Sequence, residues 1–353
     1  MKERNYGIDA LRIVSMFMVV VLHVLGRGGV LQTAPRGSIN YNAAWLLETS
    51  AYCAVNCYAL ISGYVGVDSK YRYKSIIYLW CRVVFYMAAI TAFCYVVFPE
   101  LVHRQEIINI FFPITKYQYW YFTAYAGLFI IMPLLNAAVN HMEQKQLRTA
   151  IIVGVLFFSV ATTAWDEDPF KLNGGYSAWW LAILYVIGGY INRYKILEKA
   201  HKSLLLLGYI LMVILSWGTK IVLENATINH SEWLMLHSEL LIRYTSITIL
   251  LCAIFLLLFF RNIKFPKWMQ QIIKFIAPSA FSVYLIHTQP IIWINKFTDY
   301  FKGFACFSLS QEIIAVLTAA LTIFLGGIMI DMIRRILVYI IFLPKKFSKK
   351  SST

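Results

Sequence analysis

The sequence predicts an all-α integral membrane protein with about ten transmembrane helices in one bundle and both termini in the cytoplasm. Hydrophobic residues make up 60% of the 353 positions and charged residues only 14%, which is far from the composition of a soluble globular domain. Apolar stretches of about 20 residues, the length that a helix needs to cross a bilayer, recur along almost the whole chain. Basic residues concentrate in alternate connecting segments, which the positive-inside rule assigns to the cytoplasm.

Ten stretches have the length and composition of a spanning helix, and they form one polytopic domain over residues 1–343. The expected spans cover residues of about 8–26, 43–63, 76–98, 119–138, 149–165, 177–192, 203–222, 240–260, 275–295 and 312–341. The last stretch is long enough to tilt in the bilayer or to end in an interfacial helix near Pro344. Residues 344–353, "PKKFSKKSST", form a basic cytoplasmic tail that is suited to anionic lipid.

The formal net charge of +15 does not indicate a nucleic-acid partner, because membrane topology accounts for most of the basic excess. Neither a G-x-x-x-x-G-K-[ST] loop nor a dinucleotide-binding glycine pattern is present, so ATP-driven transport has no support. The six cysteines lack the spacing of a zinc site or a disulfide framework. We therefore expect no metal and no permanently bound cofactor.

The first span, "DALRIVSMFMVVVLH", carries three ionisable residues, Asp9, Arg12 and His23. Such groups are costly in a bilayer and usually face a partner or a water-filled cavity. His23 follows Arg12 by eleven residues, or about 16 Å of helix and almost three whole turns, so both side chains should emerge on nearly the same face. Asp9 is close enough to pair with Arg12. The alternative is that Arg12 snorkels to lipid headgroups and His23 makes a polar contact between helices.

Two further spans place ionisable residues at matching depths. Arg82, in "YLWCRVVFYM", is expected at the depth of Arg12, where two guanidinium groups could hold an anionic cofactor that enters from the cytosol. His287, in "FSVYLIHTQP", is expected in the outer half with His23, and Pro290 should loosen the helix there. The alternatives are that Arg82 binds a helix carbonyl or a lipid phosphate and that His287 is a core histidine bound to a backbone carbonyl.

Four residues at the outer level are candidates for binding a substrate. Trp120, Tyr121 and Tyr125 open the fourth span and could stack on a sugar ring, although an aromatic belt at the membrane interface would also explain them. Glu48, in the outer part of the second span, is a weaker candidate. Glu239 and Arg243 have the i, i+4 spacing of a surface salt bridge.

Taken together, these stretches resemble the membrane acyltransferase 3 family. The arginine and histidine of "RIVSMFMVVVLH" are separated by ten residues on the first span, as in that family. Three further stretches are similar and stand in the expected order, namely "LISGY" (60–64), "YWYFTAYAGLFIIMPLL" (119–135) and "FSVYLIHTQP" (281–290). The chain differs on the third span, where members often have two arginines three apart, because Leu79 precedes Arg82. It also lacks the extracytoplasmic hydrolase-like domain of many relatives.

The resemblance implies an enzyme of a bacterial plasma membrane that moves an acyl group, usually acetyl from cytosolic acetyl-CoA, to a sugar hydroxyl on the outer face. It implies a catalytic role for His23 and donor binding by Arg12, with Asp9 and Arg82 as further donor-binding candidates. His23 could act as a general base in direct transfer, or as a nucleophile that becomes acylated. His287 could orient His23 or donate a hydrogen bond to the oxyanion.

Two other classes of function remain open from the sequence. A transporter or flippase would also line its path with buried ionisable residues, although no inverted repeat is evident. A membrane sensor could bind an extracellular small molecule without chemistry. The expected partners of the enzyme are acyl-CoA, an extracytoplasmic sugar acceptor and membrane lipids, and the sequence leaves a homo-oligomer open.

Overall fold

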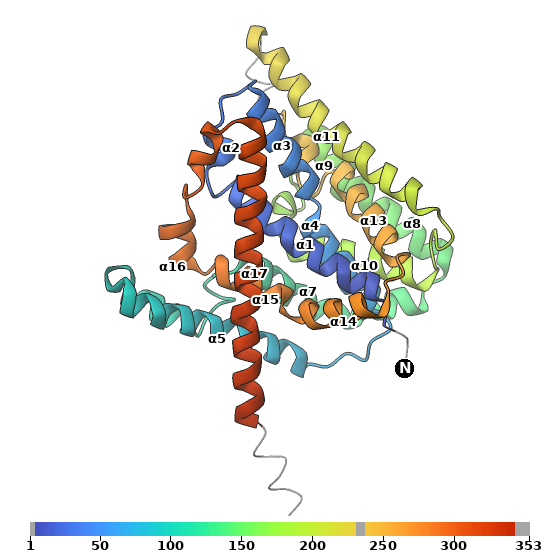
Figure 1. The fold of residues 1–353 in the computed structure, drawn as a ribbon. Coiled ribbons are helices and arrows are strands. Elements are labelled where there is room, and N and C mark those ends of the chain that lie inside the picture. Colours follow the sequence, from blue (N-terminus) through green and yellow to red (C-terminus); the bar gives the residue numbers. More distant parts are fainter. Residues whose placement is uncertain (1–3, 231–236, 343–353) are drawn as a thin grey trace, which may run out of the picture.

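The computed structural model describes residues 4–230 and 237–342, and within these residues it is a bundle of helices without β-strands (Figure 1). The helices are α1 (Tyr6–Leu25), α2 (Val30–Thr33), α3 (Ile39–Ala51), α4 (Ala54–Gly66), α5 (Lys74–Val97), α6 (Arg104–Asn109), α7 (Trp120–His141), α8 (Gln144–Val155), α9 (Thr162–Trp165), α10 (Ala178–Arg193), α11 (Lys202–His230), α13 (Ile247–Arg261), α14 (Lys267–Ile276), α15 (Ala280–His287), α16 (Pro290–Ile292) and α17 (Leu309–Phe342). Short π-helical turns follow α8 at Leu156–Ala161 and α16 at Trp293–Phe297.

Helix α1 is the central element of the bundle and packs against α3, α4, α13, α14, α15 and α17. Its start is fixed by Asn5, whose side-chain oxygen accepts hydrogen bonds from the backbone N–H groups of Gly7 and Ile8. The amide nitrogen of Asn5 also donates to the carbonyl of Arg261 at the end of α13, at 3.1 Å. This double contact sets the height of α1 against its neighbour and so determines where its polar side chains lie.

The all-α, multi-span prediction is confirmed, because eight helical segments in the described residues are long and apolar enough to cross a membrane. Two of the ten expected spans have a different form. The stretch 43–63 is divided between α3 and α4 at Tyr52 and Cys53, and the stretch 177–192 corresponds to α10, which has 16 residues. The number ten and the cytoplasmic position of the termini therefore stay predictions.

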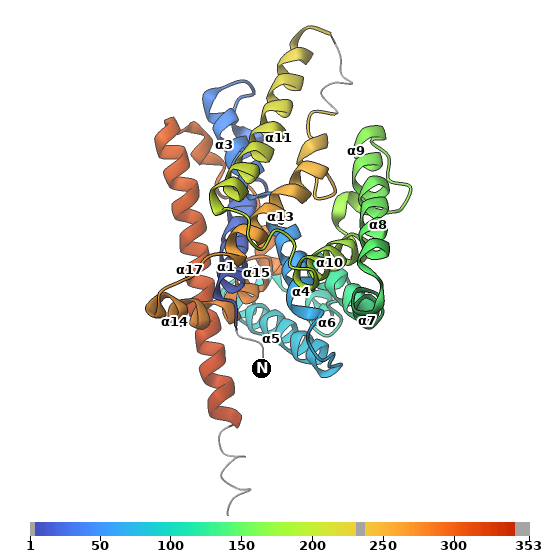
Figure 2. The same cartoon turned by 90° about the vertical axis from the view of Figure 1, so that its right-hand side faces the viewer.

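The last helix, α17, is continuous over 34 residues, which corresponds to about 51 Å. This length exceeds the roughly 30 Å hydrocarbon core, so a tilt accommodates it better than an early end. Pro344 and the basic tail 344–353 lie outside the described residues. Figure 2 shows α17 and the α8–α9 segment on opposite sides of the bundle, with α1 and α4 between them.

Glycines allow close packing between α4 and α10. A Cβ atom on Gly63 would stand 1.9 Å from the carbonyl oxygen of Tyr185, and one on Gly188 would stand 2.1 Å from that of Leu60. Small residues at such crossings are typical of membrane helices, where contact between backbones replaces the hydrophobic driving force. The α4–α10 pair thus forms a tight unit beside α1.

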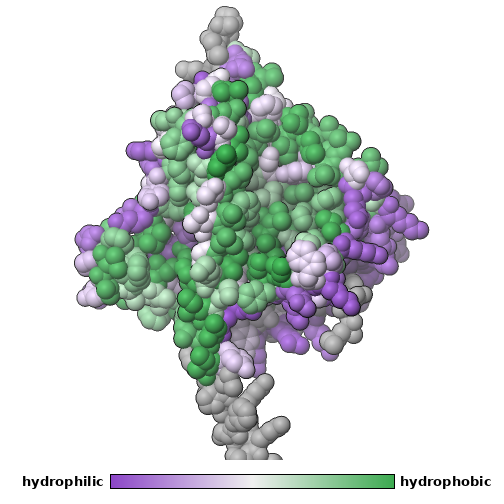
Figure 3. All heavy atoms as spheres, in the orientation of Figure 1, coloured by the Kyte–Doolittle hydropathy of each residue, from purple (hydrophilic) through white to green (hydrophobic). Residues whose placement is uncertain are grey.

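The molecular surface agrees with a membrane location. The visible face in Figure 3 is largely hydrophobic along α17, while hydrophilic residues gather at its margins, including the lower right beside the chain start. Large apolar side chains such as Ile333 and Leu211 are about half exposed. Exposed apolar surface of this extent suits contact with lipid rather than water.

The glycine packing can be tested with Gly188→Ala. The new methyl group would press on the Leu60 carbonyl, so we expect a loss of about 1–3 kcal/mol and a lower melting temperature of the purified protein. Gly218→Ala on α11 is the matched control, because a Cβ there has open space within 4 Å. Equal melting temperatures for the two variants would contradict the proposed close approach.

Candidate active site

The two predicted histidines meet in the interior of the bundle. His23, near the end of α1, and His287, the last residue of α15, are 264 positions apart, and their Nδ1 and Nε2 atoms lie 2.7 Å from one another. The expected break near Pro290 is present, because α15 ends at His287 and Pro290 begins a new helix. His287 is buried, whereas His23 is half-buried.

The hydrogen bonds of His287 determine which nitrogen of His23 is free. His287 Nδ1 lies 2.6 Å from the carbonyl oxygen of Val283, which can only accept, so this nitrogen carries the hydrogen. In a neutral ring the Nε2 atom of His287 is then an acceptor, and His23 Nδ1 donates to it. The lone pair of His23 Nε2 remains available to accept a proton.

A small aromatic chamber lies beside His23. Its volume is about 30 Å³, which is enough for water but far smaller than the other cavities of the bundle. Its walls come from α1, α4, α7, α15 and the segment just before α13, and they comprise Met16, Val19, Leu22, His23, Val55, Tyr58, Trp120, Tyr121, Tyr244, Phe281 and Tyr284. The chamber therefore brings apolar surface and several tyrosines next to a single titratable ring.

A second, larger cavity of about 530 Å³ lies at the other end of α1. Arg4, Asp9 and Arg12 line it together with Tyr64 of α4, Asp68 and Ser69 in the segment after α4, and Asn192 of α10. Two carboxylates thus balance the two arginines, and the name basic cavity refers only to the presence of Arg4 and Arg12. Asp9 stands between the two arginines, because Arg4 Nε lies 2.5 Å from its Oδ2 atom and Arg12 Nη1 lies 2.8 Å from its Oδ1 atom. The expected Asp9–Arg12 pair is thus confirmed, and Arg4, which sequence reasoning did not single out, completes it.

One face of α1 connects the chamber with this basic cavity. Residues on one face of a helix recur with the spacing i, i+4, i+7 and i+11, which is the spacing of Arg12, Met16, Val19 and His23. The first lines the basic cavity and the other three line the chamber, so the common face expected for Arg12 and His23 is confirmed. Tyr58 stands at the boundary, because its hydroxyl donates to the Arg12 carbonyl at 2.9 Å and its ring lines the chamber.

Comparison with known protein families agrees with this arrangement. A family model described as an acyltransferase domain matches residues 5–332, nearly the whole chain. The chain belongs to the acyltransferase 3 family. With its multi-span fold, it is a membrane acyltransferase. No curated protein and no solved structure shows significant similarity to it.

In this acyltransferase Arg82 lies apart from Arg12. Its Nη1 atom is 3.5 Å from the carbonyl of Pro278, and its guanidinium interacts electrostatically with Arg334 and Arg335 of α17. It does not line the cavity that holds Arg4 and Arg12. The structure thus does not bring Arg12 and Arg82 together, and a donor-binding role for Arg82 stays a prediction.

The predicted aromatic residues of α7 divide between two positions. Trp120 and Tyr121 line the chamber, whereas Tyr125, one turn further along α7, stacks on Tyr121 with ring centroids 6.3 Å apart and does not line it. Tyr244 stacks against Trp120 with ring centroids 6.1 Å apart, and its ring centroid lies 4.8 Å from that of Tyr52. Sequence reasoning missed Tyr244, because only the fold places it beside α7.

Glu48 lies at the rim of this aromatic cluster. It stands on α3, one turn before Tyr52, and is only 7% exposed, and its Oε2 atom has no hydrogen-bond partner among the described residues.

The expected Glu239–Arg243 salt bridge is wrong. Arg243 pairs with Asp166, and Glu239 lies 3.6 Å from the Nζ atom of Lys220, because a 3₁₀ turn replaces the α-helix that the i, i+4 spacing assumes.

Trp293 covers the histidine pair, and sequence reasoning did not identify it. Its ring centroid is 4.7 Å from that of His23, and Phe297 stacks on it at 5.1 Å. Trp293 begins a π-helical turn, a form that is frequent at functional sites. The guanidinium carbon of Arg27 lies 5.8 Å from the Trp293 ring centroid, so a cation–π contact holds the ring that covers the two histidines.

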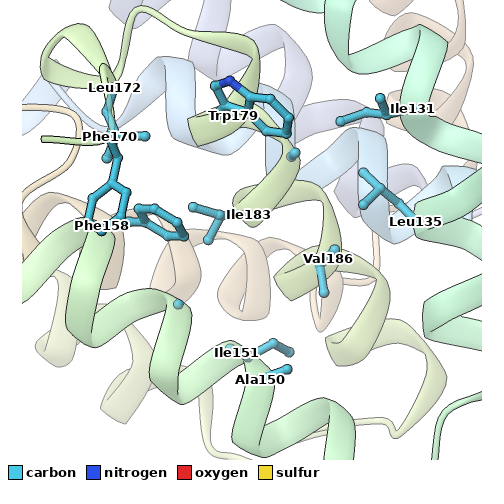
Figure 4. Close-up of a pocket in the computed structure, with 12 residues that line it drawn as sticks. Ile131, Leu135, Ala150, Ile151, Phe158, Phe170, Leu172, Trp179, Ile183 and Val186 are labelled. Atoms are coloured by element: carbon cyan, nitrogen blue, oxygen red, sulfur yellow. The ribbon is translucent and has the colours of Figure 1, made fainter.

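Another cavity, of about 440 Å³, is not a candidate active site. Figure 4 shows its apolar lining, which includes Ile131 and Leu135 of α7, Ile151 of α8, and Trp179 and Ile183 of α10. No lining residue has a titratable side chain. Without a group that can accept or donate a proton, this cavity is better suited to hydrocarbon than to acyl transfer.

The orienting role of His287 can be tested by comparing His287→Leu with His287→Gln. Leucine leaves His23 Nδ1 without an acceptor and frees the ring to rotate, so we expect the acyl-transfer rate to fall by about 10²–10⁴-fold. The glutamine oxygen can still accept from His23, so its loss should be smaller. Turnover rate and KM are measured together, and an effect confined to KM would contradict an orienting role.

Proposed function

We propose that this membrane acyltransferase moves an acetyl group from cytosolic acetyl-CoA to a hydroxyl of a surface glycan or lipid-linked sugar, with His23 as the general base. The observation that carries the proposal is the chain of hydrogen bonds from the Val283 carbonyl through His287 to His23. This chain fixes the His23 ring and leaves its Nε2 lone pair unoccupied. A positioned neutral imidazole is the group most often used to remove a hydroxyl proton in catalysis.

The position of the basic cavity supports a donor that enters on the side of the chain start. Arg4 and Arg12 supply guanidinium groups of the kind that bind phosphate in bidentate geometry, and Asp9 holds both of them in place. CoA phosphates would bind there, while the pantetheine arm carries the thioester along the α1 face toward His23. Met16 and Tyr58, at the boundary, must shift to admit it.

The aromatic cluster supports an acceptor on the opposite side. Trp120 is half-buried and is the ring on which a sugar would stack, with Tyr121 and Tyr244 packed around it, and the buried Glu48 oxygen would accept a sugar hydroxyl if these rings moved aside. The small volume of the chamber favours acetyl over longer acyl groups. Tyr125 is one turn deeper along α7 and would act through Tyr121.

In the proposed reaction His23 Nε2 accepts the proton of the acceptor hydroxyl as its oxygen attacks the thioester carbonyl. The C–O bond forms, the C–S bond breaks, and the proton passes from His23 to the leaving thiolate, so that an ester and CoA result. Both nitrogens of His287 are already engaged, which favours an orienting role over oxyanion binding. The hydroxyls of Tyr121 and Tyr284 on the chamber wall are suitable donors to the oxyanion.

The central test is His23→Ala, assayed with labelled acetyl-CoA and membrane vesicles that carry the surface glycan. We expect label transfer to fall by about 10²–10⁴-fold, because His23 is the only imidazole, and no carboxylate is found, among the described residues that line the chamber. His141→Ala is the matched control, since His141 is exposed at the end of α7.

Full transfer by His23→Ala would refute both the general-base mechanism and an acylated His23. Label that stays bound to the protein in the absence of acceptor would favour acylated His23 as an intermediate. Movement of an unmodified solute, with no transfer of label, would instead indicate a transporter. Mass spectrometry of the surface glycans, with and without the protein, identifies the acceptor.

Donor binding can be tested separately with Arg12→Gln. Loss of a charge-assisted contact to phosphate, worth about 1.5–3 kcal/mol, should raise the KM for acetyl-CoA about tenfold or more and affect the turnover rate less. Lys195→Gln is the control, because Lys195 lies on the surface in a loose pair with Glu198. An unchanged KM for Arg12→Gln would place the donor elsewhere, with the Arg82 cluster as the next candidate.

A further inference from the structure

A groove between α5 and α17 is not used by the proposed reaction. It has a volume of about 480 Å³, and its floor includes Ile286 and His287 of α15. Its remaining lining consists of Phe85, Tyr86, Ala89, Ile90, Phe93, Ile292, Ile330, Ile333, Arg334 and Leu337. His287 thus faces this groove on one side and His23 on the other.

The groove opens toward the lipid. Helices α5 and α17 both pack on α15 and form the two walls. Apolar residues of these walls are exposed, with Phe93 at 57%, Ile333 at 59% and Leu337 at 46%. Both helices belong to the segments that are long and apolar enough to cross a membrane, so we expect hydrocarbon around the groove.

Three arginines stand together at one end of the groove: Arg334 lines it, and Arg82 and Arg335 lie next to Arg334 outside the lining. Arg334 is neutralised by Asp331, which is fully buried and also accepts hydrogen bonds from Tyr86 and Ser282. Arg82 and Arg335 donate to the uncharged carbonyl oxygens of Pro278 and Phe275. In the part of the chain that the structure describes, no carboxylate lies within ion-pair distance of either. The end of the groove therefore carries three arginines against one carboxylate, Asp331, which pairs with Arg334 and also interacts electrostatically with Arg82.

We propose that this groove binds an anionic phospholipid, with its phosphate on Arg82 and Arg335 and one acyl chain extended along the groove to His287. Cations at the edge of hydrocarbon are stabilised by a lipid phosphate, and arginine binds phosphate in bidentate geometry. The segment from Arg82 to Phe93 measures about 16 Å along α5, a length that suits an extended hydrocarbon chain.

The shape of the groove favours a lipid over the nucleotide part of acyl-CoA as the source of the phosphate. Beyond Arg334 the lining offers Tyr86 and His287 as polar groups, so a nucleotide would lose its hydrogen bonds to water there. A bound acyl chain would cover His287 on the side away from His23 and keep water out. The inference does not depend on the proposed acetyl transfer, because binding can be measured without any reaction.

The test uses the full chain in nanodiscs and phosphatidylglycerol with a photoreactive diazirine at the end of one acyl chain. We expect cross-links to concentrate on the far end of the groove, at Phe93, Ile286 and Ile292. The double variant Arg82→Gln/Arg335→Gln removes about 1 kcal/mol per arginine, so it should weaken labelling about 30-fold. The control Lys145→Gln/Arg148→Gln removes two exposed charges from α8 and should label as the wild type does.

Ala89→Trp provides an independent test, because it keeps the arginines and fills the exposed wall of the groove. Loss of cross-links at Ile286 and Ile292 in this variant would support the proposal, even if the double arginine variant failed to fold. Labelling spread evenly over all lipid-facing helices would overturn it. Displacement of the lipid by excess CoA would also overturn it, in favour of a CoA phosphate at Arg82 and Arg335.

Discussion

The hydrogen bond between His23 and His287 joins two helices at a depth where an unpaired polar group costs several kcal/mol. Each ring supplies a hydrogen-bond partner for one nitrogen of the other, and the carbonyl of Val283 accepts from the second nitrogen of His287. Among the described residues, three of the four ring nitrogens have a protein partner, and the fourth, Nε2 of His23, has none. The same bond thus stabilises the contact between α1 and α15 and produces the free lone pair that chemistry requires.

The register of α1 places Arg12 and His23 on one helix face, so this face connects two sides of the protein. Asn5 caps α1 and binds the Arg261 carbonyl, which fixes the height of the helix. From that start, one face carries Arg12 into the basic cavity and His23 into the chamber. A shift of one residue would rotate both side chains by about 100° and remove them from their cavities.

The sequence was sufficient for features that depend on helix periodicity. The spacing of Arg12 and His23 and the pairing of Asp9 with Arg12 follow from one helix, and the structure agrees with both. Features that depend on irregular backbone were not predictable in this way. The Glu239–Arg243 pair failed because the chain forms a 3₁₀ turn there, and Trp293 was missed because a π-helical turn brings it onto His23. Arg82 shares an expected depth with Arg12, but depth alone does not decide which neighbours a helix has.

The size of the chamber helps to decide between an enzyme and a transporter. A path for a sugar or a glycolipid would need an opening along the whole bundle, whereas the space beside His23 has a volume of only about 30 Å³. Acyl transfer demands far less, because only a few atoms must pass from the basic cavity to His23. Tyr58 and Met16, side chains at the boundary, can admit these atoms by changing rotamer while α1 and α4 stay in place. A bundle held together by close glycine contacts and by interior hydrogen bonds such as the His23–His287 pair is therefore better suited to passing an acyl group than to passing a whole solute.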